Sequence, residues 1–137
     1  MTPKINAINM VTAITEGILI TVKSNFIEEY SDAEKGNFFF KYHVEIENRN
    51  RFSVQLLRRD WYIFDSLDFP KVVSGDGVVG EQPILKSGET YAYNSGCEIH
   101  SEIGYMTGHY TFKNVDTNEE FPVLIPRFEL YFPAVLN

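Results

Sequence analysis

The chain has 137 residues, enough for one domain with a sizeable core, so we treat residues 1–137 as a single domain. A formal net charge of −7 argues against nucleic-acid binding, because phosphate contacts require a basic surface. The sequence lacks a signal-peptide pattern and any apolar run of about 18 residues, and its one cysteine, Cys97, has no partner for an internal disulfide. We therefore expect a cytoplasmic protein that does not enter a membrane.

Alternation of apolar and polar residues predicts β-strands in the first half of the chain. We expect the polar residues 1–9 to be flexible. A first strand is predicted from Gly17 to Lys23, with Phe26–Tyr30 as a candidate continuation. After a turn at residues 31–37, the clearest strand runs from Phe38 to Glu47. One of its faces is apolar and the other mostly charged, which is typical of an antiparallel sheet with one face in solvent.

The middle of the chain alternates less regularly. Phe52–Phe64 carries apolar residues on both faces, which predicts a central strand or one that bends. Residues 65–70 are expected to form a loop, and Lys71–Val73 to be extended.

Three further strands are predicted after a turn at Ser87-Gly88. They are Thr90–Ile99, with a bulge or bend at Ser95-Gly96, then Gly104–Val115, and finally Phe121–Phe132, whose two prolines favour an edge position. About seven antiparallel strands and no helix predict an all-β fold, an antiparallel β-sandwich.

Gly75, Gly77 and Gly80 have the G-x-G-x-x-G spacing of a dinucleotide-binding fingerprint. That fingerprint requires a helix directly after the last glycine, because the N-terminal N–H groups of the helix hold the pyrophosphate. Here Pro83 follows three residues after Gly80, and no amphipathic run comes next. The sequence therefore excludes a Rossmann-type site.

Two interpretations of the glycine stretch remain open. The favoured one is a loop in which glycine provides positive φ or close backbone approach. The other is a loop that binds a phosphate-containing ligand through free N–H groups, with charge from nearby arginines. The candidate ligand-binding residues are Gly75, Asp76, Gly77, Gly80, Glu81, Arg58 and Arg59.

Four arginines, Arg49, Arg51, Arg58 and Arg59, form the densest basic group. We favour a solvated face with local ion pairs, and a contact with phosphate or an acidic partner is the alternative.

Catalytic and metal-binding patterns are weak. Ser95, Cys97 and His100 are close in sequence but do not converge on a substrate, so we assign no catalytic residue. We also assign no metal site and no cofactor. His43 and His109 would approach each other only if their strands pair, and a divalent cation between Asp76 and Glu81 is a weak alternative.

Motifs along most of residues 10–137 together resemble one known family. They are Val54-Gln55-Leu56-Leu57-Arg58-Arg59 with Trp61, Ile63 and Asp65; Gly75 to Pro83; Tyr93 with Ser95-Gly96; Gly104, Met106, Gly108 and Tyr110; and Ile125-Pro126 with Phe128, Leu130 and Pro133. This combination resembles the ApaG (CorD) family. The family usually has His before the Trp, whereas this chain has Asp60, which puts a basic or metal-binding role at that position in doubt.

The resemblance implies a sandwich of the immunoglobulin/fibronectin type III kind. It also implies a link to cobalt resistance and magnesium efflux, and to genes beside a diadenosine tetraphosphate hydrolase. Related domains in F-box proteins and in a polymerase-interacting protein look like interaction modules. We therefore expect a non-catalytic domain that binds a protein partner. The alternative is binding of pyrophosphate or a nucleotide through the glycine stretch. Unpaired strand edges also make a homodimer a candidate.

Overall fold

The computed structural model describes residues 9–136, and most of the predicted flexible segment, residues 1–8, lies outside them. The described part contains nine β-strands and two short 3₁₀ helices, and none of its helices has the length and apolar character needed to cross a membrane. The elements are β1 (Asn9–Thr15), β2 (Ile18–Phe26), η1 (Glu28–Tyr30), β3 (Phe38–Asn48), β4 (Val54–Asp65), β5 (Lys71–Asp76), β6 (Ile84–Leu85), β7 (Thr90–Ile99), β8 (Ile103–Asn114), β9 (Glu120–Tyr131) and η2 (Pro133–Leu136).

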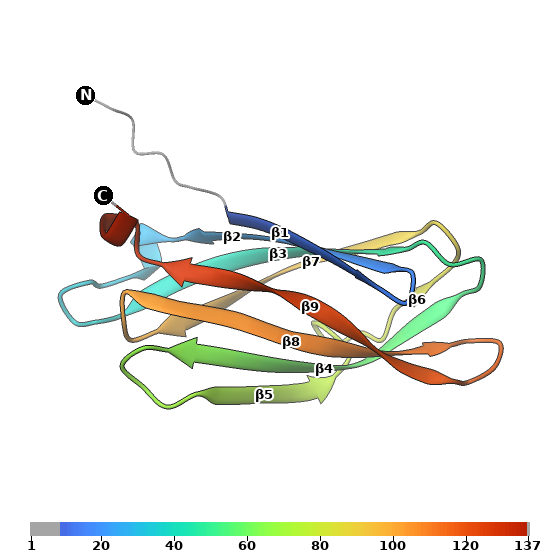
Figure 1. Ribbon diagram of the computed structural model, residues 1–137. Coiled ribbons are helices and arrows are strands. Elements are labelled where there is room, and N and C mark those ends of the chain that lie inside the picture. Colours follow the sequence, from blue (N-terminus) through green and yellow to red (C-terminus); the bar gives the residue numbers. More distant parts are fainter. Residues whose placement is uncertain (1–8, 137) are drawn as a thin grey trace, which may run out of the picture.

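The strands form two antiparallel sheets that pack face to face (Figure 1). One sheet has the order β1-β2-β3-β7, and the other has the order β5-β4-β8-β9 with β6 paired to β4. The chain passes between the sheets from β3 to β4, from β5 and β6 to β7, and from β7 to β8. This arrangement confirms the predicted antiparallel sandwich of the immunoglobulin/fibronectin type III kind.

The inner faces of both sheets supply one aromatic core. Trp61 of β4 lies at its centre, with its ring centroid 5.4 Å from Tyr42 of β3, 5.9 Å from Phe128 of β9 and 6.3 Å from Tyr110 of β8. All four side chains are buried. Burial of each large side chain contributes about 1.5–3 kcal/mol, so these contacts hold the two sheets together.

Two N-terminal expectations need correction. Strand β1 was not predicted, because its residues are only half-buried or exposed and show no strong apolar face. It joins β2 through a tight turn in which Glu16 and Gly17 both have positive φ, as a two-residue hairpin requires. The suggested strand continuation through Phe26–Tyr30 is wrong, because β2 ends at Phe26 and Glu28–Tyr30 forms η1.

The predictions for the later strands agree better with the structure. β4 is central and β9 is an edge strand, as predicted. A bulge or bend was expected at Ser95-Gly96, and the bulge is wrong, because β7 pairs with β3 in uninterrupted register. Glycine is required at position 96 for a different reason: a Cβ there would lie 2.4 Å from Cζ of Phe39. The register shifts instead between Leu56 and Arg58 in β4 and between Met106 and Gly108 in β8.

We predict that Gly108→Ala destabilises the fold by at least about 2 kcal/mol. A Cβ at this buried position would lie 2.0 Å from the backbone oxygen of Asp60 in the neighbouring strand. Urea unfolding measures the change, with Thr107→Ala on the same strand as the control. An unchanged midpoint for Gly108→Ala would contradict the prediction.

Candidate functional site

The glycine stretch begins inside β5 and continues as a tight turn. Val78 N–H donates to the Glu81 oxygen at 2.8 Å, and Glu81 N–H donates back to the Val78 oxygen at 2.9 Å. The two residues between them, Val79 and Gly80, have φ of +46° and +79°, which is the pattern of a type I′ turn. The two-residue strand β6 follows instead of a helix, in agreement with the exclusion of a dinucleotide fingerprint.

The turn is anchored on β4 by the carbonyl of Leu57. Leu57 lies where the β4–β8 register shifts, and its oxygen accepts the N–H of Gly77 at 2.8 Å and Nε2 of Gln82 at 2.9 Å. Arg59 adds a second clamp, because its Nη1 donates to the oxygens of Asp76 at 3.0 Å and Gly77 at 2.8 Å. Contacts within the protein therefore determine the conformation of the loop.

Each glycine of the motif has its own structural reason. A Cβ on Gly77, whose φ is +60°, would lie 2.0 Å from the Glu81 oxygen. A Cβ on Gly75 would lie 3.0 Å from the Arg59 guanidinium nitrogens. Gly80 has open space around its Cβ position, and only its positive φ favours glycine.

The loop offers few free donors to an anion. The N–H groups of Gly77, Val78 and Glu81 donate within the protein. Within residues 9–136, those of Val79 and Gly80 have no partner, and the Arg59 guanidinium has no carboxylate within ion-pair distance.

The two predicted arginines do not converge. Arg58 is exposed, with Nη2 3.7 Å from Oδ2 of Asp60. Arg59, the next residue along the strand, is half-buried and clamps the loop. Arg49 pairs with Glu47 at 3.2 Å in the turn after β3. Neighbouring residues of a strand point to opposite faces, so the predicted basic patch is divided.

Three buried tyrosines lie near Arg59. The hydroxyls of Tyr93 and Tyr110 are hydrogen-bonded to each other across the sandwich. Burial raises the pKa of Tyr42, Tyr93 and Tyr110, and the positive charge of Arg59 lowers each pKa by a smaller amount. Sequence reasoning missed this cluster; its signal was that Tyr42 and Tyr110 each lie between two polar residues, as inward-facing residues do, whereas Tyr93 follows Ala92.

The position that departs from the resembled family lies on the outer face of the five-stranded sheet. Asp60 Oδ1 accepts a hydrogen bond from the Ser74 hydroxyl at 2.6 Å, and Asp60 Oδ2 lies 3.3 Å from His109 Nε2. Serine and histidine both face the same carboxylate rather than each other. His109 is thus not placed to activate Ser74, because a nucleophile needs the base within hydrogen-bonding reach.

Exposed apolar side chains gather on this sheet and on its β4–β5 loop. We define the outer patch as Tyr62, Phe64, Leu67, Phe69 and Val72; Leu67 is 80% and Phe69 85% exposed. The Phe64 ring stacks on Tyr105 at 4.9 Å, and the Arg127 guanidinium lies 3.7 Å from the Tyr105 ring centre. By contrast, the outer face of β3 in the other sheet carries Lys41, His43, Glu45 and Glu47.

Asp65, Asp68 and His100 place potential metal-ligating atoms within 4.8 Å of one another. Asp65 is buried and accepts hydrogen bonds from His100 N–H at 2.6 Å, from Leu67 N–H at 3.3 Å and from Ser101 Oγ. These bonds join the β4–β5 and β7–β8 loops beside a cleft of about 550 Å³. They give Asp65 a structural role whether or not a cation binds.

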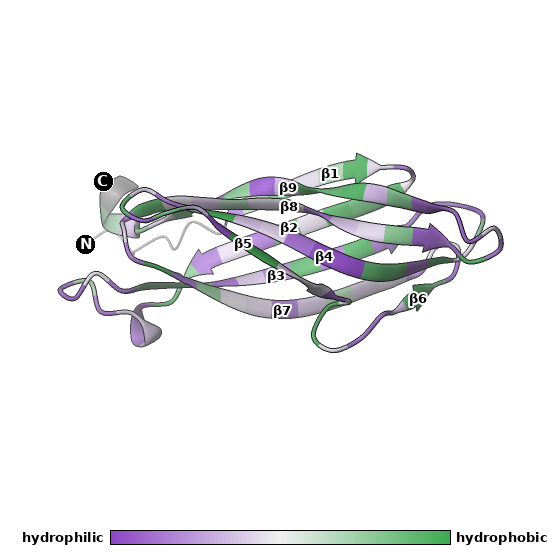
Figure 2. Cartoon of the chain, turned by 90° about the horizontal axis from the view of Figure 1, so that it is seen from below, coloured by the Kyte–Doolittle hydropathy of each residue, from purple (hydrophilic) through white to green (hydrophobic). Residues whose placement is uncertain are grey.

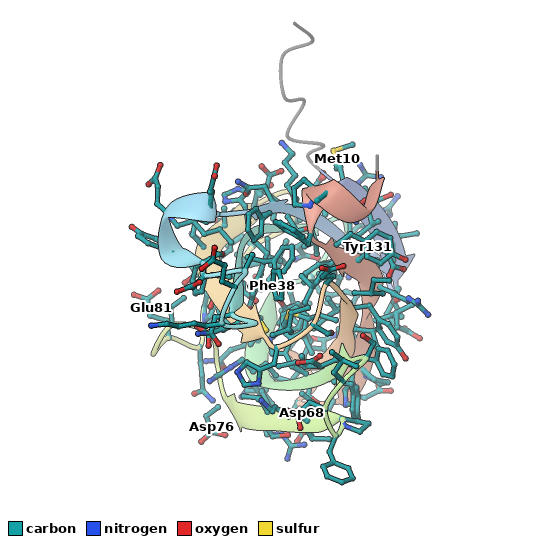
Figure 3. The ribbon with its side chains drawn as sticks, turned by 90° about the vertical axis from the view of Figure 1, so that its left-hand side faces the viewer. Met10, Phe38, Asp68, Asp76, Glu81 and Tyr131 are labelled. Carbon is teal, nitrogen blue, oxygen red and sulfur yellow. The ribbon has the colours of Figure 1, made fainter. Side chains whose placement is uncertain are left out.

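The two metal-ligand pairs that were considered from the sequence as weak alternatives do not come together. His43 and His109 lie on different sheets, and His43 Nδ1 is 2.8 Å from Oδ1 of Asn94. Figure 3 places Asp76 and Glu81 at separate points on the periphery, and Glu81 accepts the Tyr91 hydroxyl at 3.1 Å.

Comparisons of the sequence and of the structure with known proteins point to the same family. Residues 28–114 match the family described as the ApaG domain. A Protein ApaG from Methylocella silvestris is 48% identical over 127 residues, which cover 92% of this chain and 96% of that protein. One from Beijerinckia indica is 44% identical over 131 residues, covering 93% and 100%. A crystal structure named for an ApaA protein from Bordetella pertussis superposes with a TM-score of 0.81 at 35% identity, covering 85% of this chain and 94% of that one.

We predict that Gly77→Ala and Gly80→Ala differ strongly in stability. Gly80→Ala should cost about 1 kcal/mol, because only its positive φ is strained. Gly77→Ala should cost at least about 3 kcal/mol, because the new Cβ also meets the Glu81 oxygen. Urea unfolding measures both variants, and equal losses would show that the close approach at Gly77 is unimportant.

The free energy of unfolding should depend on pH through the Asp65 carboxylate. Burial alone raises the pKa of Asp65, but hydrogen bonds from Ser101, His100 and Leu67 outweigh it and lower the pKa below its usual value. The stabilisation is therefore present above the unfolded-state pKa of about 3.9 and is lost as pH falls through the lower folded-state pKa. Asp65→Asn should cost about 1–3 kcal/mol at neutral pH.

The difference between wild type and Asp65→Asn should shrink between about pH 5 and pH 2. Unfolding midpoints measured across that range test this, with the exposed Asp116→Asn as the control. A difference that is constant with pH would contradict the role given to the ionised carboxylate.

Proposed function

The chain belongs to the ApaG domain family, and we propose that it is a non-catalytic binding domain that recognises a protein partner. The outer patch is the observation that supports this proposal. Tyr62 is 43% and Val72 63% exposed and the two are paired across β4 and β5, Phe64 lies two residues after Tyr62 on β4, and Leu67 and Phe69 lie in the loop that joins the two strands. Contiguous exposed apolar groups rimmed by polar ones mark interaction sites, because covering them releases water from apolar surface.

The patch also has the side chains that strong contacts use. Tyrosine and arginine are enriched among the residues that dominate binding energy. Here Tyr62 and the Arg127–Tyr105 stack lie on the same outer face. The rigid sheet holds these groups in place before binding, which reduces the entropy cost of association.

A phosphate-containing ligand, such as pyrophosphate or a nucleotide, is the second candidate. It is supported by the Arg59 guanidinium, which has no carboxylate partner within residues 9–136, and by the free N–H groups of Val79 and Gly80. An arginine without a counter-charge is suited to phosphate oxygens.

The family link to cobalt resistance and magnesium efflux adds a divalent cation as a possible effector, for which Asp65, Asp68 and His100 are the candidate ligands. We propose a cytoplasmic location, in keeping with the single cysteine.

A photo-crosslinking amino acid at Val72 tests the leading proposal, with the same group at Thr21 on the other sheet as the control. We expect one protein to be captured from Val72 and not from Thr21. The purified captured protein should bind wild type at least about tenfold more tightly than Tyr62→Ser/Phe64→Ser.

Two results would contradict the proposal. One is equal capture from the two positions. The other is hydrolysis of pyrophosphate or ATP by the purified protein at a rate that Glu81→Gln abolishes and the exposed Glu119→Gln does not.

A further inference from the structure

Three of the four strand edges are shielded in ways that natural sheets use. β1 and β9 lie side by side along one flank (Figure 1), where Leu124 N–H of β9 lies 3.3 Å from Thr15 Oγ1 of β1. β9 also contains Pro122 and Pro126. β5 has only six residues and begins at Lys71, and β6 pairs with the next part of β4.

The fourth edge strand, β7, has none of these protective features. It has ten residues and pairs with β3 in unbroken register, with no bulge, proline, lysine or arginine. In Figure 2 it forms the rim of its sheet, with β6 near its first residues, and within residues 9–136 no strand pairs with its outer edge. The exposed residues along its centre, Ala92, Asn94 and Gly96, are small. Alternate backbone N–H and C=O groups of β7 are therefore open to another strand.

We propose that β7 is a strand-addition site, where an extended segment of a protein partner that contains lysine or arginine pairs with Thr90–Ile99. This inference rests on the proposed binding function and specifies the kind of partner. Backbone hydrogen bonds would supply the affinity, as in other cases of strand addition. The added strand would widen the four-stranded sheet to five.

Charge decides which kind of strand fits. Glu89 lies just before β7 and Glu98 lies near its end, and the segment from Ser87 to Phe112 contains no lysine or arginine. On β3 and just after it, Lys41 lies over the Tyr30 ring at 5.3 Å and Arg49 pairs with Glu47 at 3.2 Å. Lys71 of β5, whose charge reaches Cys97, lies 3.8 Å from Asp68, and Lys86 precedes Glu89 by three residues. A cationic strand would gain attraction to the two glutamates.

The same charges disfavour a second copy of this chain. Two β7 strands paired antiparallel would bring two molecules of net charge −7 together, with acidic ends and no compensating cation on either strand. A basic partner segment is therefore the better match.

A fluorescent peptide of about ten alternating valines and lysines, matched to the length of β7, serves as the probe. Fluorescence anisotropy should show binding that is about tenfold or more tighter than that of the valine–glutamate counterpart. The lysine peptide with every backbone nitrogen methylated should not bind, because it cannot form the ladder. Amide exchange in β7 should slow when the unmethylated lysine peptide is added.

Variants at exposed positions locate the contact. Ala92→Lys/Asn94→Lys on β7 should weaken binding of the lysine peptide about tenfold or more, and Ala92→Glu/Asn94→Glu should not weaken it. Thr12→Lys/Ile14→Lys, on the opposite edge of the same sheet and also exposed, is the matched control and should bind like wild type. Unfolding midpoints establish that each variant is folded.

Four outcomes would overturn the inference: no binding of the lysine peptide, equal binding of the methylated peptide, no effect of the β7 lysines, or a dimer in sedimentation that these lysines abolish. If crosslinking at Val72 still captures its partner, the proposed function stands without this site. If that capture fails while the peptide binds β7, the outer patch is wrong and the strand-addition site remains.

Discussion

One backbone carbonyl holds the connection between the two sheets in place. The register of β4 shifts at Leu57, and the oxygen of Leu57 then holds Gly77 and Gln82. Arg59 fixes the same loop two residues later in the strand. This loop carries the chain from β5 through β6 to β7, which enters its sheet where Gly88 and Glu89 form backbone hydrogen bonds with Asn48 of β3. These bonds add to the Val78–Glu81 pair and to the pairing of β6 with β4, so most of the polar backbone of the crossover has partners within the protein.

Regular alternation made most of the sandwich predictable. In β3 the inward residues from Phe38 to Ile46 are apolar and most of the outward ones are polar, so its buried face follows from period two; the exceptions are the buried Asn48 at its end and the half-buried Phe39 on the outer face. The two-sided apolar pattern of Phe52–Phe64 pointed correctly to a central strand. β1 escaped detection because an edge strand buries little, and Ser95-Gly96 misled because Gly96 makes room for the Phe39 ring rather than a bulge.

The candidate site was less predictable, because it depends on which face each side chain takes at a bulge. Arg58 and Arg59 are adjacent in sequence, yet one faces solvent beside Asp60 and the other clamps the glycine loop. The glycine spacing resembled a phosphate-binding motif, although Gly77 is required by the nearby Glu81 oxygen. The outer patch was missed although its residues all lie between positions 62 and 72, because the sequence does not show that Tyr62 and Val72 become neighbours when β4 and β5 pair.

The single tryptophan gives the sandwich a built-in optical reporter. Trp61 is 3% exposed, and its ring lies against aromatic side chains from β3, β8 and β9. Its neighbours therefore come from both sheets. Tyrosines at this range transfer excitation to it, and its emission wavelength follows the polarity around it. Separation of the layers would change both properties at once, so one intrinsic fluorophore follows the packing between sheets without any added label.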